Sequence, residues 1–256
     1  LVISEKDPWA MRGYQLYGEI AAQVGTPVHV YSANRIRQNF TRLQTALGKA
    51  RLCYAVKANS NLAVLRILSE LGAGADIVSG GELARAIAGG IPAERIVFSG
   101  VGKTEAELHA ALKAGVHQIN VESIAEIDHV AGVAKALGVV AAIAFRLNPD
   151  IAADTHHKIA TGRKGDKFGI DHEQMLEAAE RTRRYPSLKL CGLAVHIGSQ
   201  LFDLGIYRAA FTVVAGYVAE LRAAGFDLTR LDLGGGMGVP YHDETPFDAE
   251  GFADVV

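Results

Sequence analysis

The sequence predicts an α/β protein in which parallel strands alternate with helices, as in a (β/α)8 barrel or a doubly wound sheet. Short apolar runs recur along the 256 residues, and most are continuously apolar, which is typical of strands buried on both faces of a parallel sheet. The 28 glycines suit many tight junctions between strands and helices. The expected strands are Pro27–Ser32, Leu52–Ala58, Ala75–Ser79, Arg95–Ser99, Gln118–Glu122, Val139–Asn148, Gly192–Gly198 and Arg230–Leu233.

The expected helices lie between these strands. Leu62–Leu71 and Tyr207–Ala224 both carry apolar residues at the three- and four-residue spacings of a helix with one buried face. Three helix starts have Ser or Thr followed three residues later by Glu, the pattern of a capping box: Ser79, Thr104 and Ser123. Glycines mark the expected helix ends, at positions 72, 89, 90, 115, 138 and 225.

The composition excludes several classes of protein. Lys and Arg total 26 against 28 for Asp and Glu, so a net charge of −2 offers no basic surface for nucleic acid or an anionic membrane. The longest apolar run, Gly138–Phe145, is too short to span a bilayer, and residues 1–15 lack the apolar region of a signal peptide. Cys53 and Cys191 lie far apart in strand-like runs, without disulfide or metal-ligand spacing, so we expect a reducing cytoplasm and no metal site.

Several motifs fail on inspection. A stretch that resembles a phosphate-binding P-loop has Val97 where the motif needs glycine. Two possible dinucleotide fingerprints have Ile77 and Val239 at their third glycine. The adjacent His156 and His157 lack the spacing of zinc ligands, so we interpret them as loop residues.

Lys57 has the clearest chemical implication. It stands at the C-terminal end of the apolar strand Leu52–Ala58, and lysine is almost never buried without a partner or a purpose. Burial makes an amine a usable nucleophile, as Schiff-base chemistry requires. The structural alternative is a strand-end lysine whose ammonium group reaches solvent.

His196 occupies a similar position in the run Gly192–Gly198. A lone histidine in an apolar strand is usually a core residue that is hydrogen-bonded to a neighbour. In a (β/α)8 barrel, however, functional side chains project from the C-terminal ends of the strands. Lys57 and His196 stand at the ends of the first and sixth expected barrel strands.

Gly234, Gly235 and Gly236 follow the seventh expected barrel strand. Successive glycines let backbone N–H groups approach an anion without obstruction by Cβ atoms, although a flexible turn has the same composition. Barrel phosphate sites commonly lie after the seventh strand, and Ser199, after the sixth, offers an additional hydroxyl.

Asp76 and Arg146 are charges inside apolar runs, and each would be costly to bury alone. We therefore expect the two to pair inside the mouth of the barrel, an arrangement that is also compatible with a purely structural role. A buried lysine, an aromatic base and a glycine-rich anion loop at one end of a barrel together suggest pyridoxal 5'-phosphate as the cofactor.

The motifs resemble those of the fold-type III pyridoxal-phosphate decarboxylases, above all their diaminopimelate decarboxylase branch. They keep their order over roughly residues 25–245. The loop Thr155–Gly162, followed by Lys167–Gly169, resembles the active-site loop of the diaminopimelate branch, which ornithine decarboxylases lack. The other matching motifs are Tyr54–Asn59, Ala75–Leu83, Ile96–Lys103, Asn120–Ser123, Arg146–Pro149, His196–Gln200 and Asp232–Gly238.

The resemblance implies residue roles. Lys57 would hold the cofactor as a Schiff base, and His196 would stack on its ring. The triple glycine and a serine would bind the phosphate, and a charged pair would lie nearby. The residues implied to bind the cofactor are Lys57, Asp76, Arg146, His196, Ser199, Gly234, Gly235 and Gly236, with Lys57 and His196 as the catalytic residues.

The implied reaction is decarboxylation of meso-2,6-diaminopimelate to L-lysine and CO₂, the last step of lysine biosynthesis. The resemblance also implies a cytoplasmic homodimer with shared active sites that acts on a small amino acid, not on nucleic acid or membranes. One alternative is a sister decarboxylase acting on ornithine, arginine or a siderophore precursor. Another is a non-catalytic barrel that binds a partner, and a weaker one is alanine-racemase chemistry.

The sequence differs from that family on its C-terminal side. Neither an eighth barrel strand with its glutamate loop nor a C-terminal β-domain is found, and neither Cys53 nor Cys191 matches that domain's catalytic cysteine. We therefore expect residues 36–256 to form a (β/α)8 barrel without its last strand. Residues 1–35, with their strand, would belong to a mostly absent β-domain, and we expect the chain alone to be inactive.

Overall fold

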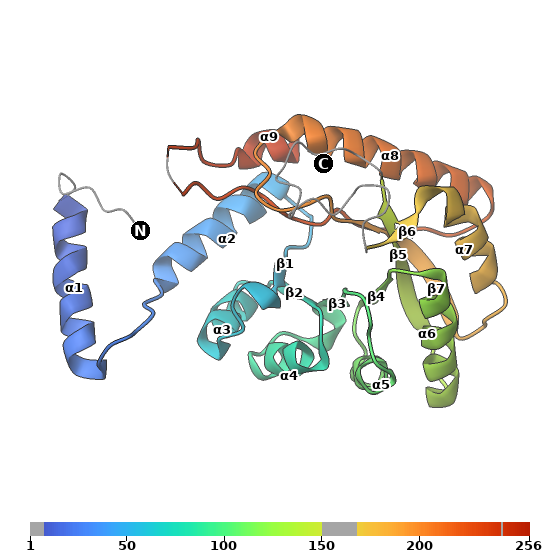
Figure 1. The fold of residues 1–256 in the computed structure, drawn as a ribbon, viewed down its shortest axis with the longest axis horizontal. Coiled ribbons are helices and arrows are strands. Elements are labelled where there is room, and N and C mark those ends of the chain that lie inside the picture. Colours follow the sequence, from blue (N-terminus) through green and yellow to red (C-terminus); the bar gives the residue numbers. More distant parts are fainter. Residues whose placement is uncertain (1–7, 150–167, 242) are drawn as a thin grey trace.

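The strands form one parallel sheet that curls into an open barrel (Figure 1). The computed structural model describes residues 8–149, 168–241 and 243–256. The neighbours in the sheet follow the order β1-β2-β3-β4-β5-β7-β8, and β6 pairs with β5 beside this path. The strands are β1 (Cys53–Ala55), β2 (Gly74–Ile77), β3 (Ile96–Phe98), β4 (Gln118–Val121), β5 (Ala141–Asn148), β6 (Ile170–Asp171), β7 (Leu188–Val195) and β8 (Arg230–Asp232).

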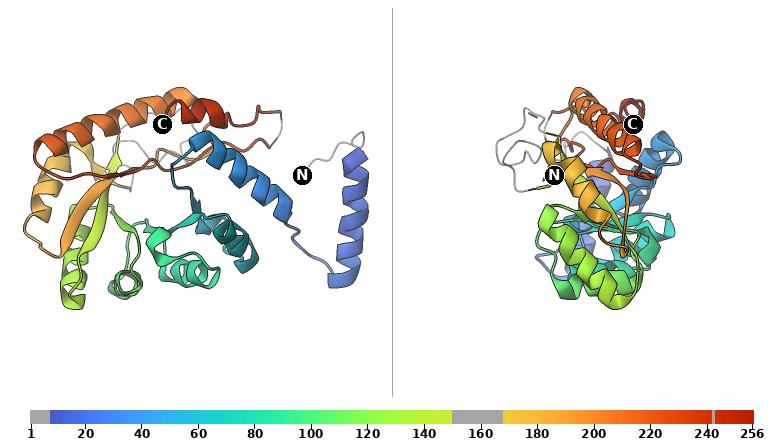
Figure 2. Two further views of the ribbon diagram at one scale, coloured as in Figure 1. Left: turned by 180° about the vertical axis from the view of Figure 1, so that it is seen from behind. Right: turned by 90° about the vertical axis from the view of Figure 1, so that its right-hand side faces the viewer.

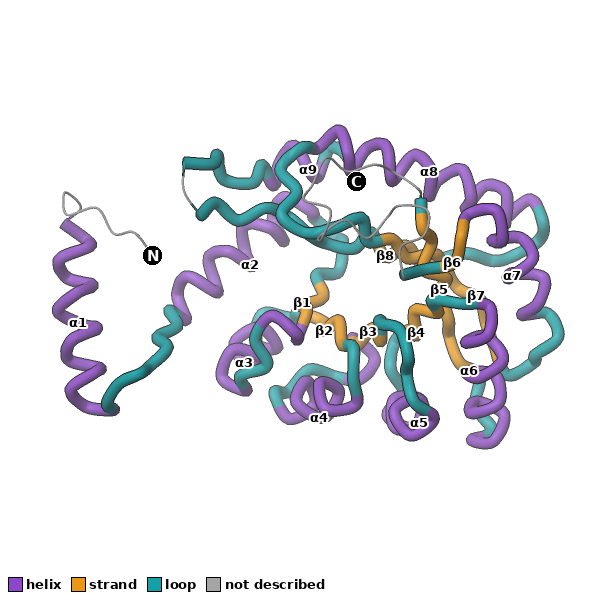
Figure 3. The backbone as a smooth tube through the Cα atoms, in the orientation of Figure 1, coloured by secondary structure: helices purple, strands orange, loops and turns teal. Residues whose placement is uncertain are grey.

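The strand order decides between the two folds that the sequence allows. A doubly wound sheet reverses its strand order at a switch point, whereas these strands follow one another around the sheet in chain order. The curl of the strands inside a layer of helices is visible in Figure 3. The prediction of a (β/α)8-type barrel is therefore confirmed. The seven strands on the main path correspond to the seven barrel strands that the sequence predicts, and only the two-residue β6 was not expected.

Helices cover the outer face of the sheet, and Figure 2 shows this arrangement from two further directions. Between β8 and β1, where the described strands do not pair, α9 contacts α2, so the helical layer continues across the gap. The helices are α1 (Pro8–Val24), α2 (Ala33–Leu47), α3 (Leu62–Glu70), α4 (Gly80–Ala88), α5 (Glu105–Ala114), α6 (Ile124–Leu137), α7 (Met175–Thr182), α8 (Leu204–Ala223) and α9 (Ala249–Ala253), with short 3₁₀ turns η1 (Val56–Ala58), η2 (Ala93–Arg95) and η3 (His172–Gln174).

The N-terminal part differs from the prediction. Pro27–Ser32, expected as a strand, is irregular and joins α1 to α2. A strand needs a hydrogen-bonded neighbour, and none of the described strands pairs with this segment. In Figures 1 and 2, α1 stands away from the barrel, whereas α2 packs on it next to α3 and α9.

Helix α8 is the longest helix in the described part of the chain and the one that is long and apolar enough, by length and composition, to cross a membrane. Because Arg208 and Glu220 interrupt its apolar positions, no uninterrupted apolar run of membrane-spanning length marks this helix in the sequence. Its side chains Tyr207, Val214 and Leu221 are buried, at positions that share one helix face. The apolar character of α8 therefore serves, at least on this face, to cover the sheet.

The predicted helix caps are present with one difference in detail. Ser79, Thr104 and Ser123 each accept a hydrogen bond from the backbone N–H three residues later. At Thr104 the carboxylate of Glu107 also returns to the cap's own N–H, which completes the box. At the other two helices the carboxylate reaches one residue further back, to the N–H of Val78 or Glu122. These glutamates thereby tie the preceding strand ends to the helices.

Lys103, in the loop between β3 and α5, is a buried lysine with a structural role. Its ammonium group donates to the carbonyl oxygens of Gly100 and Asn120, both at 2.7 Å, and to Glu126 at 2.8 Å. Only 1% of its side chain is exposed. Lys103 belongs to the stretch before Thr104 that resembles a P-loop. Its ammonium group binds protein oxygens from two neighbouring βα units, not a phosphate of a nucleotide.

We predict that Lys103→Met lowers the free energy of unfolding by about 3 kcal/mol, because it leaves the carboxylate of Glu126 without its buried partner. Chemical denaturation of the intact protein measures this change. Lys113→Met, at an exposed position of α5, is the control and should change stability by less than about 0.5 kcal/mol. Equal effects of the two substitutions would contradict the assignment.

Candidate active site at the C-terminal ends of the strands

Lys57 lies in η1, directly after β1. The buried position that the sequence predicts for Lys57 is wrong in this structure, because the strand ends at Ala55 and the turn directs Val56 into the core while Lys57 is exposed. Its ammonium group remains close enough to the neighbouring strand ends to lower the pKa values of Asp76 and His196. Lys57 therefore belongs to the same cluster as those two residues.

Asp76, on β2, lies opposite Ala55 of β1 and faces the inside of the barrel. The hydroxyl of Ser99 donates to its carboxylate at 2.6 Å. Burial raises the pKa of Asp76 from 3.8 to about 6, with a further contribution from the carboxylate of Asp232, while Ser99, Lys57 and Arg146 act in the opposite direction. Burial thus disfavours the charged form of Asp76, and the two positive charges partly offset this penalty.

Arg146, on β5, does not form its ion pair with Asp76 as expected. Its guanidinium donates instead to Glu122 at 3.0 Å, and only 1% of the Glu122 side chain is exposed. The ring of Phe168 covers the guanidinium at 4.9 Å. Because Glu122 follows β4, the direct neighbour of β5, it reaches Arg146 more easily than Asp76 does. Arg146 still acts on Asp76 electrostatically, because its positive charge lowers the pKa of the Asp76 carboxyl.

His196 directly follows β7 and is half-buried. Burial lowers the pKa of the imidazole from 6.5 to about 4, and the positive charges of Arg146 and Lys57 add to this effect. The ring is therefore neutral at physiological pH. Its Cε1 atom lies beside Gly236, 3.5 Å from the place where a Cβ atom would stand.

The triple-glycine loop follows β8 and packs against the backbone that carries His196. Gly234 and Gly236 have φ values of 71° and 86°, a conformation that favours glycine. A Cβ atom on Gly234 would collide with the carbonyl oxygen of Val195, and one on Gly236 with that of Gly198. Gly235, in contrast, has open space at its Cβ position. The sequence needs glycine here because two backbone segments touch.

Ser199 lies in the loop that the glycines contact. An isolated parallel bridge joins Leu201 to Met237, and the side-chain amide of Gln200 exchanges hydrogen bonds with the backbone of Val239. Ser199 itself is exposed between these contacts. The structure therefore brings Ser199 and the triple glycine to adjacent loops.

These loops suit a phosphate group. Within the described residues, no protein acceptor pairs with the backbone N–H groups of Gly235 and Gly236. Free N–H groups in a turn of alternating backbone sign form a concave site for anions. A flat neutral imidazole beside that loop and an amine after the first strand complete an arrangement that fits pyridoxal phosphate.

The sequence reasoning missed a second set of polar residues, although the sequence contains a signal for them. Gln118, Asn120 and Glu122 alternate along β4 and its end, so all three project to the same side of the strand. This side is the barrel interior, because Asn120 bonds to Ser99 and to Asp232 on the non-neighbouring β8. A polar residue at every second position of a buried strand predicts a polar interior.

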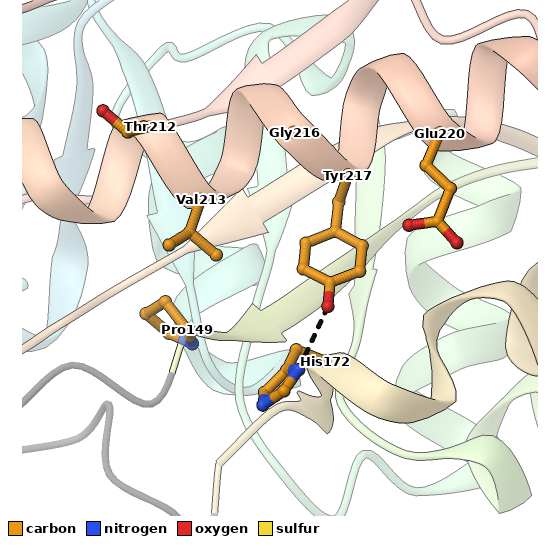
Figure 4. Close-up of a pocket in the computed structure, with 7 residues that line it drawn as sticks. All are labelled: Pro149, His172, Thr212, Val213, Gly216, Tyr217 and Glu220. Carbon is orange, nitrogen blue, oxygen red and sulfur yellow. Dashed lines mark hydrogen bonds between the residues drawn. The ribbon is translucent and has the colours of Figure 1, made fainter.

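Two other regions do not enter the site. The loop Thr155–Gly162, Lys167 and the His156–His157 pair lie outside the described residues. A hollow on the surface is lined by Pro149 after β5, by His172 of η3, and by one side of α8 (Figure 4). There the ring of His172 and the hydroxyl of Tyr217 are 3.0 Å apart. None of the predicted site residues lines this hollow.

Comparison with known proteins decides the family. The family model of the pyridoxal-binding domain of pyridoxal-dependent decarboxylases matches residues 33–256. The chain belongs to this family. The cofactor that the sequence suggested, pyridoxal 5'-phosphate, is thereby confirmed.

Individual relatives agree. The diaminopimelate decarboxylase of Zymomonas mobilis is 48% identical over 233 residues, which are 89% of this chain and 55% of that protein. The diaminopimelate decarboxylase of Neisseria meningitidis serogroup A is 46% identical over 242 residues, 94% of this chain and 60% of that protein. The crystal structure of the Helicobacter pylori enzyme complexed with L-lysine superimposes with a TM-score of 0.91 at 41% identity, covering 93% of this chain and 61% of that one. The chain thus spans little more than half the length of these relatives.

We predict that Asp76→Asn stabilises the folded protein at about pH 8 and that this gain shrinks towards about pH 4. The folded state raises the pKa of Asp76 to about 6, so the proton is bound more tightly in the folded than in the unfolded state. The resulting stability is present below the unfolded pKa and is lost as the pH rises through 6. Chemical denaturation at several pH values measures the difference, with the exposed Asp227→Asn as the control. A pH-independent difference would contradict this electrostatic account.

Proposed function

We propose that the protein of which this chain is the pyridoxal-binding part decarboxylates meso-2,6-diaminopimelate to L-lysine and CO₂. The observation that carries the proposal is the convergence of Lys57, His196 and the triple-glycine loop at one end of the barrel. The substrate rests on relatives named diaminopimelate decarboxylase at 46–48% identity over most of the chain. We also propose that the protein works as a cytoplasmic homodimer, with active sites shared between subunits.

Different residues of the site hold different parts of the cofactor. Lys57 supplies the amine that attaches covalently to the cofactor. The N–H groups of Gly235 and Gly236, with the Ser199 hydroxyl, hold the phosphate, and Gly234 gives their loop its turn. When bound, the cofactor supplies an electron sink that accepts the electron pair left by the departing carboxylate.

The electrostatics of the barrel mouth suit this arrangement. His196 is neutral because burial and the charges of Arg146 and Lys57 lower its pKa to about 4. A neutral imidazole would add no positive charge beside the ring of the cofactor, which would serve as the electron sink. Asp76 and Arg146 place one negative and one positive group at the same end of the barrel as His196. Glu122 fixes the direction of the Arg146 guanidinium.

The proposal also assigns the two parts of the chain to domains. We propose that residues 1–35 belong to the β-domain that the family resemblance implies, whereas residues 36–256 are the barrel. The family match and α2 both begin at residue 33. Before that point, Val24 and Tyr31 expose 65% and 54% of their surface. Such apolar side chains favour an interface.

Incubation of the intact protein with meso-diaminopimelate tests the substrate. We expect equimolar L-lysine and CO₂, with little turnover of ornithine, arginine or siderophore precursors. Preferential turnover of one of those amino acids would replace the substrate and retain the chemistry. No turnover of any of them, despite bound cofactor, would favour a non-catalytic barrel.

We predict that Lys57→Ala abolishes covalent cofactor attachment and lowers kcat by at least about a thousandfold, because no other amine replaces the nucleophile. Borohydride reduction followed by peptide mass mapping should find a phosphopyridoxyl group on Lys57 in the unmodified protein and none in the variant. Lys113→Ala, at an exposed lysine on α5, should retain both the adduct and the turnover. An adduct on another lysine would refute the assignment of Lys57.

A further inference from the structure

A chain of hydrogen bonds crosses the inside of the barrel and connects the Asp76 side of the site to the glycine loop. Its central residue is Asn120 on β4, which is 2% exposed. One side-chain amide nitrogen donates both to Ser99, at 3.0 Å, and to Asp232, at 2.8 Å. The hydroxyl of Ser99 in turn donates to the Asp76 carboxylate at 2.6 Å.

The second branch ends at the glycine loop. Asp232 is the last residue of β8, and its other carboxylate oxygen accepts from the backbone N–H of Gly234 at 3.0 Å. Each Asp232 oxygen thus has a separate partner, one at the start of the glycine loop and one on the far side of the barrel. β4 and β8 are not neighbours in the sheet, so this contact crosses the interior.

The side chain of Asn120 is also held by a residue of its own strand. The side chain of Gln118, also on β4 and 3% exposed, donates to the Asn120 carbonyl oxygen at 2.8 Å. This bond fixes which end of the Asn120 amide faces Asp232, so that both N–H groups point to acceptors. A buried network in which every member is satisfied is rigid, and loss of one donor leaves a buried acceptor unpaired.

We propose that Asn120 and Asp232 are positioning residues for the phosphate of the cofactor: Asn120 holds Asp232, and Asp232 holds the first turn of the glycine loop. This inference rests on the proposed binding of pyridoxal phosphate by Gly235 and Gly236. The adjacent N–H groups can meet a phosphate only if Gly234 keeps its positive φ against the Val195 backbone. Asp232 caps that turn, and Asn120 keeps Asp232 in place from across the barrel.

The test compares two ligands of the intact protein that differ only in the phosphate, pyridoxal 5'-phosphate and pyridoxal. Asn120→Leu keeps the approximate volume and removes the donors. We expect its affinity for pyridoxal phosphate to fall about tenfold, as loss of a hydrogen bond to a charged group does, and its affinity for pyridoxal to change less than about twofold. Equal losses for both ligands, or no loss, would overturn the proposal.

Two further variants separate the branches of the network. Ser99→Ala removes only the Asp76 branch and should leave the ratio of the two affinities within about twofold of the unmodified protein. Asp232→Asn keeps an oxygen for Gly234 but removes the acceptor that faces Asn120, so it should lower the ratio like Asn120→Leu. The double variant should be no worse than either single variant, because both break the same bond. Additive losses would overturn the proposal.

Near-ultraviolet circular dichroism shows whether Asn120→Leu folds, and if it does not, Asp232→Asn alone decides the outcome. The result also separates this inference from the proposed function. If the unmodified protein binds pyridoxal phosphate no better than pyridoxal, both fail. If it binds the phosphate form better and the Asn120 and Asp232 variants keep that preference, only the positioning role fails.

Discussion

The requirement that buried polar groups find hydrogen-bond partners shapes the inside of this barrel. The outer face of the sheet is covered by helices and is apolar, but the inner face carries Asp76, Asn120 and Arg146. None of these groups can be left unpaired without a penalty of about 1–3 kcal/mol each. Their partners come from neighbouring strands or from across the barrel, and these contacts set the positions of the strand ends.

The same contacts explain the electrostatics of the site. Burial and the nearby Asp232 carboxylate raise the pKa of Asp76. Burial, together with the positive charges of Arg146 and Lys57, lowers the pKa of His196 and keeps its ring neutral. Glu122 holds Arg146 in this field, and the Asn120 amide lies between Ser99 and Asp232. These contacts hold the charged groups in fixed positions, which is the condition for a site that does not reorganise during a reaction.

Much of the fold follows from local patterns in the sequence. The strands from β1 to β8 on the main path, the glycine helix ends and the serine and threonine caps all depend on short segments, so their positions were predictable. The pairing of Arg146 was not, because a charge inside an apolar run does not reveal which strand end will face it. The position of Lys57 was missed because the apolar run continues past the end of β1, and the chain turns at Val56.

The central claim is that one end of the barrel holds pyridoxal phosphate between Lys57 and a glycine loop that the interior network positions. A crystal structure of the intact protein with bound cofactor tests it most directly. We expect the phosphate on the N–H groups of Gly235 and Gly236, the ring against His196, and the Asn120 bond to Asp232 retained. A phosphate bound away from the glycine loop, or an Asp232 side chain turned away from Asn120, would contradict the account.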